Sequence, residues 1–145
     1  MNLTTLLATL VPAASILAAP QFTPACPGCP ISVSVTNYLT GCSPGGCTYS
    51  FSVSGPSQAG FGSAFDTTCN GTDVQGFYKV CGVPDLAANL VPVQRGDQVL
   101  HIQRTPKIGS ETILWYGNVT TGRVPKGEPQ SFEVDLTAYG AIAGA

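Results

Sequence analysis

The strongest constraint on the fold is an alternation of apolar and small polar residues that recurs in several short segments. Ile31, Val33 and Val35 alternate with serine and threonine, and residues 49–53 repeat the pattern with aromatic side chains and valine. A period of two places the apolar residues on one face of a half-buried β-strand. We therefore expect the chain to form an antiparallel sheet with one buried face.

Further short strands are expected near Phe65 and at residues 77–83, 98–104, 112–119 and 131–139. Glycine and proline separate them, and the segment CSPGGC at 42–47 predicts a tight turn that joins the first two strands in a hairpin. The only helical signal is one turn at 85–89. About seven short strands with this punctuation predict an all-β fold, a small antiparallel β-barrel or sandwich stapled by disulfides.

The chain divides into four segments. Residues 1–19 carry no charged side chain, and from Leu3 to Ala19 they are mostly apolar and end in small residues, which predicts a secretory signal peptide cleaved near Ala18 or Ala19. A Pro/Cys-rich arm at 20–30, a single β domain at 31–140 and a flexible tail at 141–145 follow. We therefore expect a secreted, extracellular protein.

The cysteines agree with export. An even number of cysteines in a small exported chain indicates a disulfide framework. The spacing of the first four loosely resembles a zinc ribbon, but an oxidising compartment and the absence of a nearby histidine favour disulfides. We expect no metal and no cofactor. The six cysteines are Cys26, Cys29, Cys42, Cys47, Cys69 and Cys81.

The pairing of the first four cysteines stays open. Bridges Cys29–Cys42 and Cys26–Cys47 would clamp the arm to the first hairpin, whereas a local Cys42–Cys47 bridge is the alternative. Cys69 and Cys81 flank expected strands across one turn, so their pairing is favoured. A bridge that closes a loop of this size contributes about 3 kcal/mol in the chain-entropy model.

Charge gives little support to polyanionic partners. The chain has six basic and eight acidic residues, and no basic cluster. Binding to nucleic acid or to an anionic membrane relies on such clusters, so neither is expected as a partner. We expect a monomer or a weak dimer.

The sequence holds no recognisable catalytic motif, so we expect no enzyme. His101 is the only histidine. The alternative is a secreted, ribonuclease-like hydrolase that uses His101 with a carboxylate, because Glu111, Glu133 and Arg104 supply the other residue types of such sites. Nothing in the sequence places these residues around His101.

Two aromatic residues and two sequons are candidates for surface functions. Trp115 and Tyr116 point to opposite faces of one strand, so one belongs to the core and the other could contact a sugar or a partner. Asn70 and Asn118 begin sequons at strand ends, where a glycan could project from a glycoprotein.

Several segments together resemble a known family. They are CTYSFSVSG at 47–55, FDTTCNGTDVQGFYKVCG at 65–82 and WYGNV at 115–119, and the most specific match is 68–82. In these segments the chain resembles the Alternaria major-allergen-like family of small fungal secreted proteins. The resemblance implies a compact β-barrel, a Cys69–Cys81 bridge, an extracellular location and no catalytic centre. The family commonly has a second, later disulfide, but no cysteine follows Cys81 here.

The expected function follows from the resemblance and from the lack of a catalytic set. We expect a secreted, non-enzymatic effector, elicitor or allergen-like protein that binds a host protein or a cell-wall polysaccharide. The other two hypotheses are the His101 hydrolase and a carbohydrate-binding wall protein.

Overall fold

A single antiparallel sheet curls into a nearly closed barrel. The computed structural model describes residues 29–93, 97–122 and 128–143, and within these ranges it contains nine strands and no helix. The strands are β1 (Ile31–Ser43), β2 (Gly46–Gly55), β3 (Phe65–Thr72), β4 (Lys79–Val80), β5 (Leu86–Pro92), β6 (Gln98–Arg104), β7 (Lys107–Ile108), β8 (Glu111–Thr121) and β9 (Gln130–Ala143). The prediction of an all-β, disulfide-stapled barrel is confirmed.

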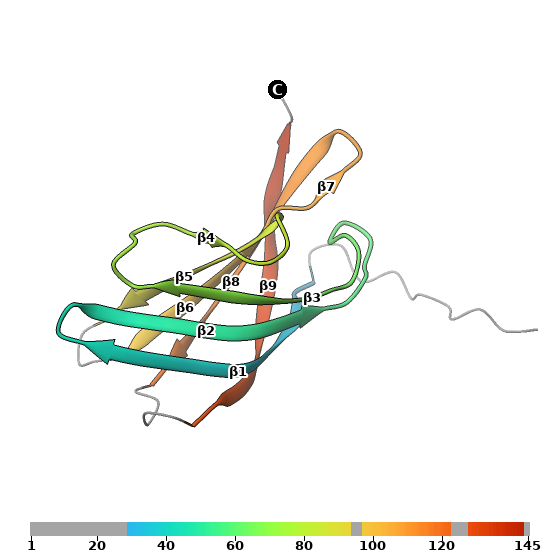
Figure 1. Cartoon of the computed structure of the whole chain (residues 1–145). Helices are drawn as coiled ribbons and strands as arrows, with labels where there is room; N and C mark the ends of the chain where they lie inside the picture. Colours follow the sequence, from blue (N-terminus) through green and yellow to red (C-terminus); the bar gives the residue numbers. More distant parts are fainter. Residues whose placement is uncertain (1–28, 94–96, 123–127, 144–145) are drawn as a thin grey trace, which may run out of the picture.

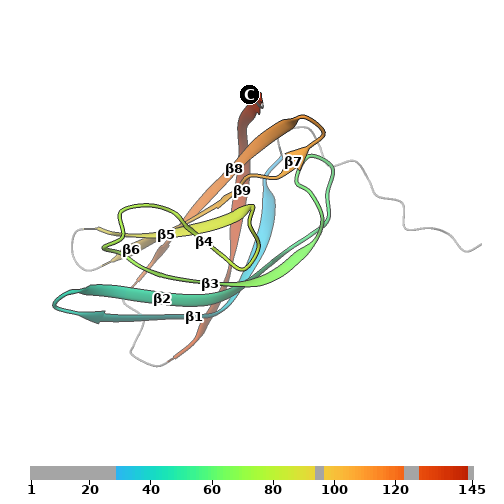
Figure 2. The same ribbon diagram turned by 45° about the horizontal axis from the view of Figure 1, so that its top comes forward.

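The strand order is β3-β2-β1-β9-β8-β6-β5-β4, and β7 pairs with β8 outside this path. In Figure 1, β1, β2 and β3 lie side by side, and β9 rises past them toward the C-terminus. The turned view in Figure 2 places β4 between β3 and β5. The two ends of the strand order therefore approach each other, which is what nearly closes the barrel.

The core is formed by the apolar residues that the alternation predicted. In β1, β2 and β9 every second side chain is buried against the others, and each fully buried valine, leucine or phenylalanine stabilises the fold by about 1.5–3 kcal/mol. β6 follows the same rule, because Leu100 and Ile102 are buried while His101 faces outward. The buried residues of β1, β2 and β9 are Ile31, Val33, Val35, Tyr38, Tyr49, Phe51, Val53, Val134 and Leu136.

A bulge in β1 changes the alternation after residue 36. Asn37 has a φ of 53°, and the pairing register shifts here on both neighbouring strands. The extra residue turns Tyr38 into the core, where its side chain is completely buried and its ring packs edge-on against Phe132. A bulge of this kind adds one residue to one strand and so inverts the faces that follow.

The expected β1–β2 hairpin is confirmed, and it carries a disulfide between directly paired residues. Cys42 bonds Cys47 with Cα atoms 4.0 Å apart. The local pairing is therefore correct, and the clamps Cys29–Cys42 and Cys26–Cys47 are wrong. Cys29 is also disulfide-bonded, and Cys26 lies outside the described residues.

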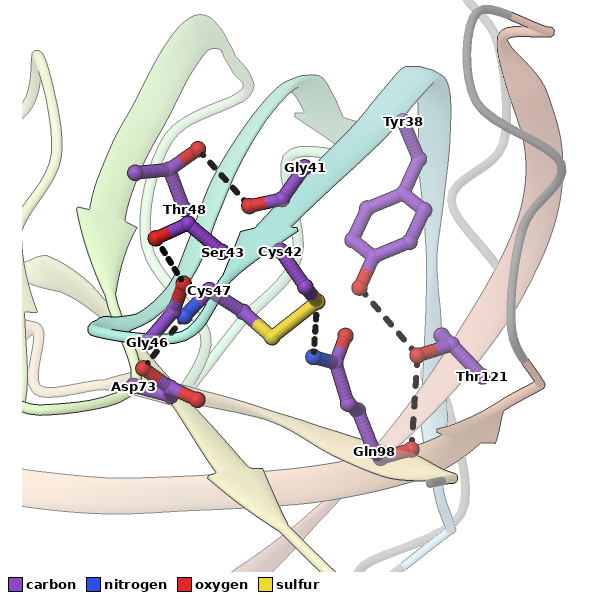
Figure 3. The surroundings of a disulfide bond; sticks show 10 residues. All are labelled: Tyr38, Gly41, Cys42, Ser43, Gly46, Cys47, Thr48, Asp73, Gln98 and Thr121. Carbon is purple, nitrogen blue, oxygen red and sulfur yellow. Dashed lines mark hydrogen bonds between the residues drawn. A yellow bond between two sulfur atoms is a disulfide. The ribbon is translucent and has the colours of Figure 1, made fainter.

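Hydrogen bonds tie the hairpin tip to the facing strands (Figure 3). The amide Nε2 of Gln98 donates to Cys42 Sγ at 3.3 Å, and the Gln98 carbonyl accepts a bond from the Thr121 hydroxyl at 3.3 Å. Thr121 in turn accepts from the phenol of Tyr38 at 3.1 Å. This chain of polar contacts links β1 to the start of β6 and the end of β8 across the barrel.

The second disulfide closes the barrel at the β3–β4 seam. Cys69 in β3 bonds Cys81, the residue after β4, so the prediction of this pair is confirmed. Beside it the Gly82 amide donates to the Thr68 carbonyl at 3.0 Å. Across the same gap the phenol of Tyr49 donates to the Ala88 carbonyl of β5 at 3.0 Å. The disulfide and these hydrogen bonds therefore join the two ends of the sheet where β3 and β4 are not paired by a continuous run of backbone hydrogen bonds.

Three expectations about individual segments need correction. Residues 77–83 contain only the two-residue strand β4. Residues 86–92 form strand β5 and not a helical turn, because β5 pairs with β6 along its whole length. β9 extends to Ala143 and pairs with β8, so most of the expected tail at 141–145 belongs to the sheet. The expected signal at 1–19 and most of the arm at 20–30 lie outside the described residues.

Candidate ligand-binding surfaces

Trp115 and Tyr116 point to opposite faces of β8, as predicted, and the structure assigns the faces. Trp115 is only 6% exposed, and its indole N–H donates to the Gly60 carbonyl at 2.8 Å. Its ring packs edge-to-face against Phe61 at 5.3 Å between centroids. Trp115 is therefore a core residue, and its assignment as a ligand contact is wrong.

Tyr116 lies on the outer face of the sheet, within a polar cluster. Its phenol oxygen is 2.5 Å from His101 Nδ1 and 3.2 Å from the amide Nδ2 of Asn118. Strand register explains the meeting, because His101 of β6 pairs with Asn118 of β8, and Gln103 pairs with Tyr116. Cross-strand neighbours on one face lie close enough for such side-chain contacts.

The proton arrangement in this cluster follows from the donors present. The amide Nδ2 of Asn118 can only donate a hydrogen bond, so the phenol oxygen of Tyr116 accepts it. The phenol hydrogen of Tyr116 is then free to be donated to His101 Nδ1. In that arrangement His101 carries its hydrogen on Nε2, which is the one donor of the neutral ring. Burial lowers the pKa of His101 below 6.5, and this favours the neutral ring that the arrangement requires.

Tyr139 extends the cluster along the surface. Tyr139 lies at the register shift between β8 and β9, and its side chain is 70% exposed. Its ring meets Tyr116 edge-to-face at 5.6 Å, and the His101 ring lies 5.7 Å from Tyr116 on the other side. We call His101, Tyr116 and Tyr139 the aromatic row.

Two further polar residues adjoin the aromatic row. Asn89 of β5 pairs with His101, and its Oδ1 is buried without a hydrogen-bond partner. Tyr78 precedes β4, and burial raises its pKa, with a further rise from the nearby phenol of Tyr116. The outer face of β5, β6, β8 and β9, with Tyr78 before β4, therefore gathers hydrogen-bonding and aromatic groups.

The residues named for a hydrolase are not assembled around His101. Arg104 is three residues further along β6 and points into the barrel, where it bonds Asp85 at 3.1 Å. Its guanidinium lies 4.4 Å from the ring centroids of both Phe61 and Phe65. Arg104 therefore supports the core, on the opposite side of the sheet from the histidine.

The two glutamates of that hypothesis lie elsewhere on the sheet. Glu133 of β9 accepts a hydrogen bond from the Ser32 hydroxyl of β1 at 3.2 Å. Glu111 begins β8, where it pairs with Ile108 in the β7 hairpin and with Ala143. The hydrogen bonds in the described part of the chain thus bring neither carboxylate to His101.

A second surface lies on the segment from Asp73 to Val80, which we call the 73–80 segment. Val74, Phe77 and Val80 expose 67%, 64% and 58% of their surface, more than any other large apolar residue of the described chain except Tyr139. A turn-rich connection up to residue 76 and a strand at 77–83 were predicted, whereas the exposure of these side chains was not. An apolar surface concentrated on one loop is typical of an interaction site.

Polar side chains hold the backbone of the 73–80 segment. The Asp73 amide donates to the Cys47 carbonyl at 3.0 Å, and Asp73 Oδ1 accepts from the Cys47 amide at 2.8 Å. Gln75 accepts from the Thr72 amide at 3.2 Å and donates to the Phe77 carbonyl at 3.0 Å. The polar groups therefore face the protein and the apolar groups face solvent, which is the reverse of an ordinary surface loop.

The two sequon asparagines are both exposed, near the C-terminal ends of their strands. Asn70 of β3 accepts a bond from Lys79 Nζ at 3.0 Å, at the edge of a shallow groove of about 570 Å³ on the outside of β1, β2 and β3. Asn118 lies beside the aromatic row. Glycans at the two positions would therefore cover different surfaces.

Neither a metal site nor a membrane-spanning helix is found among the described residues. No group of three or more His, Cys, Asp or Glu side chains in these ranges could hold a metal ion. No helix in the same part of the chain is long and apolar enough to cross a membrane. Comparison with protein-family models, with curated proteins and with solved structures finds no match. The resemblance to the Alternaria allergen family stays a prediction.

Proposed function

We propose that this chain is a secreted, non-enzymatic, effector- or elicitor-like protein that acts by binding a host protein through the 73–80 segment. The observation that carries the proposal is the exposure of Val74, Phe77 and Val80 on one loop. The two disulfides are consistent with an extracellular protein.

The loop is held in one conformation before any partner arrives. Cys69–Cys81 fixes its two ends at the barrel seam, and Asp73 fixes its start to the β1–β2 hairpin. A preorganised loop loses little conformational entropy on binding, so more of the contact energy appears as affinity. Large aromatic anchors dominate protein interfaces, and truncation of one commonly costs about 2 kcal/mol or more. Of the two aromatic residues on the segment, Phe77 is exposed whereas Tyr78 is half-buried, so Phe77 is the expected anchor.

The test compares purified, oxidised protein with a Phe77→Ser variant by infiltration into plant leaves. Necrosis or a defence burst is expected from the wild type and not from F77S. Ile108→Ser is the matched control, because Ile108 is an exposed apolar residue on β7, and this variant should keep the activity. A reduced and alkylated sample tests whether the response needs the folded barrel.

Two outcomes would contradict the proposal. A response to F77S equal to that of the wild type would remove the 73–80 segment as the binding surface. Turnover on a nuclease or glycosidase panel that disappears in His101→Gln would support the hydrolase hypothesis in place of a binding function.

A further inference from the structure

The outer face of β5, β6, β8 and β9 carries a second recognition surface, built differently from the 73–80 segment. Its aromatic row combines exposed ring surface with hydrogen-bonding atoms, whereas Val74, Phe77 and Val80 offer no polar side-chain groups. We propose that the aromatic row binds a sugar unit of a neutral polysaccharide. The two surfaces adjoin at Tyr78, but they offer different side chains to a ligand, so either proposal can fail without the other.

Ring geometry supports a sugar ligand. Tyr116 and Tyr139 meet at an interplanar angle of 80°, so their rings form two walls of a shallow corner. Tyr139 is 70% exposed, so much of its side chain is accessible to a ligand. A pyranose has an apolar C–H face that stacks on an aromatic ring and an equatorial edge of hydroxyl groups. The C–H face of the sugar can therefore stack on one tyrosine ring while its hydroxyl edge lies along the other.

The hydrogen-bonding groups support the same class of ligand. When His101 Nδ1 accepts from the Tyr116 phenol, the ring carries its hydrogen on Nε2 and can donate it to a ligand. Asn89 Oδ1, beside His101, is a buried acceptor without a hydrogen-bond partner. A sugar hydroxyl can accept the hydrogen bond that the His101 ring offers at the surface.

Charge favours a neutral ligand over an anionic one. The aromatic row and the adjoining Asn89 and Asn118 include no carboxylate, lysine or arginine, and burial lowers the pKa of the His101 imidazole, which favours its neutral form. Arg104, the nearest basic residue along β6, is buried on the other side of the sheet. Recognition of phosphate or uronate groups relies on Lys or Arg, which the aromatic row does not contain.

The test is a titration of the oxidised, folded protein with three soluble probes. Chitohexaose and laminarihexaose are neutral, and oligogalacturonate of the same length is anionic. Binding is measured by calorimetry, and the site is mapped by amide chemical shifts in 15N-labelled protein. We expect one of the neutral probes to bind and to shift the side-chain amides of Asn89, Gln103 and Asn118, and we expect no binding of oligogalacturonate.

Variants separate ring stacking from other causes. Tyr139→Ala should weaken binding about three- to tenfold, the range expected for loss of one aromatic contact. Tyr139→Phe should bind like the wild type, because it keeps the ring and the exposed site tolerates it. Phe77→Ser, on the other surface, should also leave binding unchanged.

Three results would overturn the proposal. They are no binding of either neutral probe, equal binding by Tyr139→Ala and the wild type, and chemical-shift changes confined to the 73–80 segment. The last result would assign the sugar to the other surface. Unchanged amide spectra outside β8 and β9 in Tyr139→Ala establish that the variant is folded.

Discussion

The Cys69–Cys81 bridge closes the barrel, and its removal is the sharpest test of this architecture. The two cysteines are separated by 12 positions, and in the chain-entropy model a bridge of this span stabilises the folded state by about 3 kcal/mol. Cys42–Cys47 spans 5 positions, for which the same model gives about 2 kcal/mol. The double alanine variants C69A/C81A and C42A/C47A should therefore differ by about 1 kcal/mol in unfolding free energy.

Local amide hydrogen exchange distinguishes the two disulfides more clearly than the total unfolding free energy does. The β3–β4 seam holds few backbone hydrogen bonds, one of them from the Gly82 amide to the Thr68 carbonyl. In C69A/C81A this amide should exchange its hydrogen faster, because the only other polar contact described between β3 and β4 is the exposed hydrogen bond from Lys79 to Asn70. The Cys42–Cys47 hairpin is paired on both sides of its bridge, so C42A/C47A should leave its neighbouring amides protected.

Urea unfolding followed by Trp115 fluorescence measures the free energies, because the buried indole reports on the core. Hydrogen exchange of the Gly82 amide measures the seam. The reasoning is refuted if C69A/C81A is no less stable than C42A/C47A, or if Gly82 keeps its wild-type protection without the bridge.

Three further predictions follow from single contacts. Asp85→Ala leaves the buried Arg104 without its carboxylate and should lower the unfolding free energy by about 2–3 kcal/mol, measured by urea denaturation; an unchanged midpoint would contradict the pairing. Gly117→Ala would drive a Cβ against the Asp135 carbonyl oxygen, so it should cost about 1–3 kcal/mol, whereas Gly122→Ala meets open space and serves as the control. Burial lowers the pKa of His101, so the unfolded chain takes up this proton first as pH falls through 6.5, and stability is lost from there down to the folded pKa. His101→Gln should show a smaller loss of unfolding free energy between about pH 7.5 and pH 5, and an equal loss would contradict the assignment.

The alternation of apolar residues predicted most of the sheet, because in a strand that separates core from solvent every second side chain points into the core. It failed at the bulge, where a left-handed Asn37 turns Tyr38 inward. It also missed β5: Leu86, Ala87 and Ala88 are all buried, so this strand shows no alternation to detect. A bulge, or a strand with consecutive buried residues, depends on how the neighbouring strands pack, and this cannot be seen in the local sequence.

The candidate surfaces were less predictable than the fold. Alternation placed Trp115 and Tyr116 on opposite faces, but which face is the core depends on the whole barrel. The contact between His101 and Tyr116 arises from the β6–β8 register, which joins residues 15 positions apart. The exposure of Phe77 had no sequence signal, because FYKV is as apolar as a buried strand. The hydrogen bonds of Asp73 and Gln75 hold the backbone so that the side chain of Phe77 faces solvent.

The sequon at Asn118 leads to a final prediction, because a glycan there would compete with the ligand proposed for the aromatic row. Asn118 Nδ2 donates to the Tyr116 phenol at 3.2 Å, so a sugar attached to this nitrogen would stand over the ring. Protein secreted with a glycan on Asn118 should therefore not bind chitohexaose or laminarihexaose. Thr120→Ala removes this sequon without altering Asn118 and should restore binding in the same host. Thr72→Ala removes the Asn70 sequon, on the far groove beside Lys79, and should have no effect. Intact mass identifies the glycan state of each sample. Equal binding by protein with and without a glycan on Asn118 would show that the sugar site lies away from Tyr116.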